Sequence, residues 1–90
     1  MDATNDLKLQ LKHMIVETLN LNDVNPADIL DDKPLFSGEN NITLDSIDGI
    51  ELIMAIQRKF GVRLDDQNVA RNILNTVNSM AEFIVANKVD

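Results

Sequence analysis

The sequence predicts an all-α protein: a small four-helix bundle of three longer helices and one short helix. Apolar residues recur at steps of three and four, as on the buried face of a helix, and no stretch alternates apolar and polar residues as a strand would. The 90 residues also fit one small domain. We therefore expect a single domain over residues 1–90, with a long loop between the first and second helices.

The first helix is predicted from about Thr4 to Asn20. Its apolar residues lie three and four positions apart and form one stripe, namely Leu7, Leu11, Met14, Ile15 and Leu19. His13, the only histidine in the sequence, falls in this helix with no nucleophile pattern near it. We therefore expect this helix and its histidine to have a structural role and no catalytic one.

Residues 21–43 lack helical periodicity and carry turn signals at Asn25-Pro26, Lys33-Pro34 and Gly38. Loops longer than about 12–15 residues in a compact domain are often functional. The apolar residues of this segment can attach it to the core, and they are Ile29, Leu30, Leu35, Phe36 and Ile42.

The second helix is predicted from Ser46 to Phe60, with Asp45 or Ser46 as its N-cap and Gly61 just past its end. A shorter helix follows, from Asp65-Asp66 to about Leu74. The last helix is marked by Val77, Met80, Ala81 and Ile84, and its start is capped either by Thr76 or by Ser79.

The composition excludes several functions. With no cysteine, the chain forms no disulfide, thiolate metal site or cysteine nucleophile. A net charge of −7 disfavours binding to nucleic acid or anionic lipid and favours protein partners with basic surfaces. The first residues do not resemble a secretory signal, and no apolar run is long enough for a membrane span. We expect a cytoplasmic protein.

The acidity is concentrated in one part of the chain. Residues 21–48 carry seven acids against a single lysine, whereas residues 49–90 carry five of each sign. Such a charge run is either a solvated loop or part of a docking surface.

The second helix carries more apolar residues than one core face needs. At about 100° per residue, one side carries Gly49, Leu52, Ile53, Ile56 and Phe60. Ile47, Ile50 and Met54 fall on an adjacent side and widen the apolar arc to roughly 220°. Asp48 and Glu51 border this strip. The surplus residues either pack against the long loop or form an exposed docking surface with an acidic rim.

Ser46 stands at the first turn of that helix. An Asp-Ser pair there is explained by N-capping alone. A helix N-terminus also presents free N–H groups and the positive end of the helix dipole, which help to hold an attached phosphate. A hydroxyl between a long loop and an apolar-acidic face is therefore also a suitable attachment point for a phosphate-linked group.

These residues resemble a known family. The stretch Leu44-Asp45-Ser46-Ile47-Asp48, continued by Gly49-Ile50-Glu51-Leu52 and ending at Phe60-Gly61-Val62-Arg63-Leu64, resembles an acyl carrier protein of the fatty acid and polyketide type. The order of helix, long loop, helix, short helix and helix fits the whole chain.

The resemblance implies that Ser46 accepts a 4′-phosphopantetheine arm from coenzyme A. A phosphopantetheinyl transferase performs this step with Mg²⁺, and Asp45 helps to position the metal and the transferase. The thiol of the arm then carries an acyl group as a thioester, so the chain itself needs no cysteine. The protein is expected to be a carrier and not an enzyme, to hold no metal of its own, and to be a monomer.

The resemblance also implies a recognition surface on the second helix, made of Ile47, Asp48, Ile50, Glu51 and Met54. Its expected partners are the transferase and acyl-transfer and condensing enzymes with basic docking surfaces, in fatty acid, polyketide or related lipid biosynthesis. Electrostatic complementarity of this kind raises association rates.

Some residues depart from the housekeeping carriers. Thr43 stands where many relatives have glycine, the loop from Asp31 to Thr43 is longer, and Arg58-Lys59 replace acidic residues. These departures indicate a specialised carrier of a secondary pathway. Two alternatives remain open: an aminoacyl or D-alanyl carrier protein, and an unmodified acidic helical adaptor.

Overall fold

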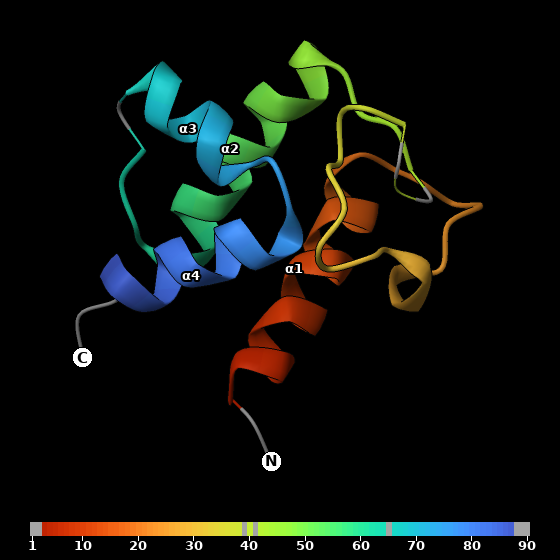
Figure 1. Ribbon diagram of the computed structural model, residues 1–90, viewed down its shortest axis with the longest axis horizontal. Helices are drawn as coiled ribbons and strands as arrows, with labels where there is room; N and C mark the ends of the chain where they lie inside the picture. Colours follow the sequence, from red (N-terminus) through yellow and green to blue (C-terminus); the bar gives the residue numbers. More distant parts are fainter. Residues whose placement is uncertain (1–2, 39, 41, 65, 88–90) are drawn as a thin grey trace.

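The computed structural model describes residues 3–38, 40, 42–64 and 66–87, and every regular element in these ranges is helical (Figure 1). The elements are α1 (Ala3–Thr18), the 3₁₀ turn η1 (Pro26–Asp28), α2 (Ser46–Phe60), α3 (Gln67–Ile73) and α4 (Val77–Asn87). Helices α1, α2 and α4 span 16, 15 and 11 residues, and α3 spans 7. The predicted all-α bundle of three longer helices and one short helix is confirmed.

Helix α1 ends at Thr18, two residues before its predicted end. Asn20 adopts a left-handed backbone with φ of 54°, a conformation that asparagine tolerates better than most residues. The Leu21 amide turns back to donate to the Val16 carbonyl at 3.0 Å. The chain therefore leaves the helix through a tight cap, which the apolar spacing did not reveal.

The described residues between α1 and α2 are irregular apart from η1, which the sequence did not predict (Figure 1). Asn25 caps this turn by accepting a hydrogen bond from the Ala27 amide at 3.0 Å. Ile29, Leu35 and Ile42 are buried, as expected. Leu30, however, is 40% exposed, so its predicted place in the core is wrong. Because Ile29 has an extended backbone, consecutive side chains point to opposite sides, and only Ile29 reaches the core.

The short helix α3 begins after Asp66, whose carboxylate accepts from the amide of Asn68 at 2.8 Å. Asp65, the other residue expected at this start, lies outside the described residues. Thr76 is the cap of α4: its Oγ accepts from the Ser79 amide, and the Ser79 Oγ accepts from the Thr76 amide, both at 3.0 Å. The alternative in which Ser79 caps the helix is therefore wrong.

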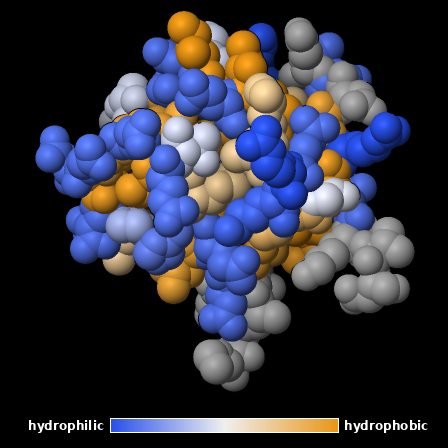
Figure 2. All heavy atoms as spheres, turned by 180° about the vertical axis from the view of Figure 1, so that it is seen from behind, coloured by the Kyte–Doolittle hydropathy of each residue, from blue (hydrophilic) through white to orange (hydrophobic). Residues whose placement is uncertain are grey.

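The core lies where α1 packs against α4 and α2, and α3 covers one end by packing on α4. Each helix and the long loop contribute apolar side chains to a single cluster, which is centred on Leu11, Ile15, Ile29, Leu35, Leu52, Ile56, Val77, Met80 and Ile84. Figure 2 shows the outer surface, where hydrophilic atoms cover most of the face and hydrophobic atoms emerge between them. Among the described helices, none is long and apolar enough to cross a membrane.

Candidate functional site

Helix α2 begins with a reciprocal pair of hydrogen bonds between Asp45 and Asp48. The Asp45 Oδ1 accepts from the Asp48 amide at 2.9 Å, and the Asp48 Oδ2 accepts from the Asp45 amide at 3.2 Å. Asp45 is therefore the N-cap and Ser46 the first helical residue, which decides between the two caps considered from the sequence. The capping box fixes the carboxylates of the residue before Ser46 and of the residue two positions after it.

Ser46 is exposed at the positive end of the α2 dipole. In the first turn, the Asp48 amide is taken by Asp45 Oδ1 and the Gly49 amide by the Asp45 carbonyl at 3.1 Å. For the amides of Ser46 and Ile47 no acceptor occurs among the described residues. Two backbone N–H groups next to an exposed hydroxyl fit a phosphate carried on that hydroxyl.

Two backbone hydrogen bonds fix the position of the residues just before Ser46. The Leu44 amide donates to the Leu35 carbonyl at 2.9 Å, and the Leu35 amide donates to the Asn75 carbonyl at 2.8 Å. Leu44 and Leu35 are both buried. The residues just before the serine are therefore attached, through Leu35, to the connection between α3 and α4.

Asn40 is a further positioning residue, which the sequence did not single out. It is 8% exposed, and its Oδ1 accepts from the Leu30 amide at 2.8 Å. Its Nδ2 donates to the carbonyls of Leu30 and Lys33, both at 2.9 Å. A single side-chain amide thus pairs with the loop backbone in the way a neighbouring strand would. The only sequence signal was the Asn40-Asn41 pair, which resembles a simple turn marker.

The apolar residues of α2 that lie outside its core-facing side are exposed. Ile47, Ile50 and Met54 are 68%, 59% and 54% accessible to solvent, so the alternative in which they pack against the loop is wrong. Glu51 is exposed beside them, whereas Asp48 is half-buried because it closes the capping box. These five residues, all on α2, are hereafter called the α2 strip. The five positions predicted for partner recognition therefore form one apolar surface with acidic residues among it.

A cleft of about 690 Å³ opens beside Ser46 between α2 and α3. Its floor includes Gly49, where an added Cβ would lie 3.4 Å from the Phe36 ring, so the glycine lets the ring approach the helix closely. Most of the wall is apolar, and it is formed by Phe36, Ile50, Ile53, Met54, Leu64, Ala70 and Leu74. Ser46, Arg71 and Asn75 supply the polar groups. Ser46 thus faces both the solvent and an apolar cleft.

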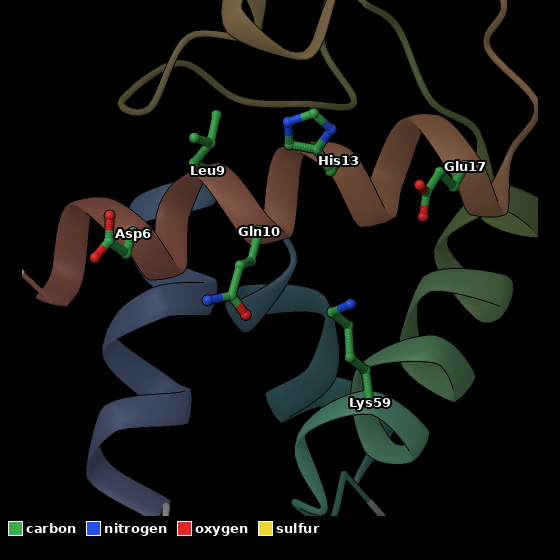
Figure 3. Close-up of a pocket in the computed structure, with 6 residues that line it drawn as sticks. All are labelled: Asp6, Leu9, Gln10, His13, Glu17 and Lys59. Atoms are coloured by element: carbon green, nitrogen blue, oxygen red, sulfur yellow. The ribbon is translucent and has the colours of Figure 1, made fainter.

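A second hollow, of about 410 Å³, lies between α1 and the other end of α2 (Figure 3). Figure 3 shows Lys59 extending from α2 toward α1, where Asp6, Gln10 and Glu17 are carried. His13 also lines this hollow. Ser46 and Lys59 lie near opposite ends of α2, about 20 Å apart along the helix axis. The hollow carries charges of both signs and is separate from the Ser46 cleft.

Among the described residues, no group of three acidic or histidine side chains could hold a metal ion.

The sequence profile of the phosphopantetheine attachment site family matches residues 9–84. The acyl carrier protein of Wolinella succinogenes is 30% identical over 78 residues, which cover 87% of this chain and 92% of that protein. The chain belongs to the acyl carrier protein family. The acyl carrier protein of Buchnera aphidicola is 31% identical over 83 residues, covering 89% of this chain and 91% of its own length. The acyl carrier protein of Helicobacter hepaticus is 31% identical over 78 residues, covering 87% and 92%.

Membership in this carrier family makes 4′-phosphopantetheine the prosthetic group of the chain. The exposed Ser46 hydroxyl and the two amides beside it fit the phosphate through which such an arm is linked. The arm supplies the thiol that the sequence lacks.

Proposed function

We propose that the chain carries acyl groups as thioesters on a 4′-phosphopantetheine arm attached to Ser46 Oγ, and presents them to partner enzymes. The observation that carries this proposal is the exposed Ser46 hydroxyl at the first turn of α2, next to amides without a protein acceptor in the described chain. The acyl carrier names of the relatives support acyl cargo over aminoacyl cargo.

Attachment requires Ser46 Oγ to form a bond to the pantetheine-side phosphorus of coenzyme A. The pyrophosphate bond breaks, the nucleotide bisphosphate leaves, and the hydroxyl proton passes to a base of the transferase. The amides of Ser46 and Ile47 hold the phosphate oxygens. Asp45, whose carboxylate is held by the capping box, is the residue that we expect to orient the Mg²⁺ that the transferase brings.

The α2 strip is the proposed docking surface for the transferase and for acyl-transfer and condensing enzymes. Exposed apolar side chains with acidic neighbours match a partner pocket surrounded by basic residues. The strip begins at the residue after Ser46, so a docked partner has its own active site close to the attachment point.

The test is the intact mass after incubation with coenzyme A, Mg²⁺ and a broad-specificity phosphopantetheinyl transferase. We expect one phosphopantetheine unit on the wild-type chain and on Ser37→Ala, a control that removes another exposed serine. Ser46→Ala should gain nothing, because it lacks the accepting oxygen. An unchanged wild-type mass with several transferases would instead favour an unmodified adaptor.

A further inference from the structure

The cleft beside Ser46 has two polar residues in an otherwise apolar wall. Arg71 lies in the last turn of α3, and Asn75 lies just beyond the end of that helix. Arg71 is the one cation that lines this cleft in the described part of the chain. Its charge is opposite to that of Asp45 and Asp48, which flank the serine.

Both side chains are available to a ligand. For the Arg71 guanidinium and the Asn75 amide no protein partner occurs among the described residues. The Asn75 backbone is held in place, since its carbonyl accepts from the Leu35 amide at 2.8 Å. An arginine offers five N–H donors and an asparagine two, so this wall can donate several hydrogen bonds into the cleft.

A saturated hydrocarbon in this cleft would match the apolar wall but would cover these donors without satisfying them. Burying unpaired polar groups is unfavourable, and most so for a charged one. A chain that carries an acceptor oxygen part of the way along would satisfy the donors and still pack against Ile50, Ile53 and Leu74. A guanidinium binds carboxylates in particular through two parallel hydrogen bonds.

We propose that Arg71 and Asn75 make the cleft selective for acyl groups with an acceptor oxygen beyond the thioester carbonyl, as a keto, hydroxyl or carboxylate group. This inference rests on the proposed function, because the acyl group must be attached at Ser46 to enter the cleft. Arg71 and Asn75 are therefore specificity-determining residues of the carrier, with no part in the attachment step.

The test compares the chain with the bare arm and with three amide-linked cargoes of equal length: hexanoyl, 3-oxohexanoyl and hexanedioyl. Loading is first verified by intact mass, so a failure to load concerns Ser46 and is separate from cleft selectivity. The midpoint temperature Tm of thermal unfolding is then measured for each form. We expect the two oxygen-bearing cargoes to raise Tm by roughly 4–8 °C more than hexanoyl, as about one ordinary net hydrogen bond would do in a domain of this size.

In Arg71→Gln this difference should largely disappear for hexanedioyl, and Asn75→Ala should reduce it for 3-oxohexanoyl. Arg58→Gln is the matched control, because it removes an exposed arginine of α2 that does not line the cleft. In the wild type, the NMR signal of the Arg71 Nε–H should shift with the oxygen-bearing cargoes and not with hexanoyl.

Three results would overturn the proposal. If hexanoyl stabilised the chain as much as the two oxygen-bearing cargoes do, the cleft would respond to chain length alone. A difference that survives in Arg71→Gln would place the selectivity elsewhere. A shift of the Arg71 signal on attachment of the bare arm, with no further change on acylation, would assign the guanidinium to the phosphodiester instead of the cargo.

Discussion

At the scale of single residues, Asn40 joins two separate parts of the loop before Ser46. One side-chain amide satisfies two groups of Leu30 and the carbonyl of Lys33, in a position that is almost fully buried. Buried backbone groups that lose their partner are costly, and among the described residues no other side chain hydrogen-bonds these three groups. Asn40 therefore stabilises a loop whose own backbone is irregular.

We expect Asn40→Ala to lower the free energy of unfolding by about 2 kcal/mol, because three hydrogen bonds are lost and partly buried groups stay unpaired. Urea unfolding followed by circular dichroism measures this change. Asn22→Ala is the control, because Asn22 is exposed and its backbone amide, which the substitution keeps, donates to the Asn20 carbonyl. Equal stability of the two variants would contradict the role assigned to Asn40.

At the scale of the element, α2 combines structural and functional requirements in its first turn. Asp45 and Asp48 close the capping box, and the same two carboxylates flank the proposed attachment serine and the start of the docking surface. At the other end, Gly61 has φ of 67° and lets the chain leave the helix, while Arg58 and Lys59 face the negative end of the dipole. A substitution of either aspartate therefore changes stability together with charge, unless the replacement keeps the cap.

Asp45→Asn and Asp45→Ala separate these two effects. Asparagine is as good an N-cap as aspartate, so Asp45→Asn should leave stability within about 0.5 kcal/mol, whereas Asp45→Ala should cost about 1 kcal/mol. Both should slow modification by the transferase, by roughly 10–100-fold, because the carboxylate that orients the metal is lost. Thermal unfolding and modification rates on the same samples measure this. A normal modification rate in Asp45→Asn would show that the residue acts only as a cap.

At the scale of the whole molecule, the charge is divided between two regions. The long loop and the start of α2 are strongly acidic, whereas exposed arginines and lysines follow from the end of α2 into α3, at Arg58, Lys59, Arg63 and Arg71. A partner with a basic surface is attracted to the acidic segment and repelled by these cations. The effect extends over roughly the Debye length, about 8–10 Å at ordinary ionic strength.

Glu51→Lys should therefore slow loading by a basic partner enzyme several-fold, with the greater loss at low salt. Glu82→Lys is the matched control: it makes the same charge change at an exposed position on α4, outside the α2 strip. Loading rates at two ionic strengths provide the comparison. Equal slowing by both variants would mean that the partner responds to net charge and not to the α2 strip.

Much of the fold was predictable because its signals are local. The period of the apolar residues located the three longer helices, the Asp65-Asp66 pair indicated the short one, and the cap signals at Asp45-Ser46 and Gly61 located both ends of α2. The errors arose at local backbone conformations that the spacing of apolar residues does not reveal. Asn20 ends α1 early through a left-handed turn, and Leu30 turns outward because the extended backbone at Ile29 allows only one of the two neighbours into the core. The roles of Ser46 and of the α2 strip stay predictions until modification and docking are measured.

The sequence by itself determined the helical class, the acidic segment and the Asp-Ser pair at the start of α2, because periodicity, charge and capping depend on residues a few positions apart. Only the tertiary structure decided that Ile47, Ile50 and Met54 are exposed, that Asn40 holds the loop, and that Arg71 and Asn75 line the same cleft as Ser46. These features require the loop, α2 and α3 to meet in space, and such contacts between distant segments follow from packing.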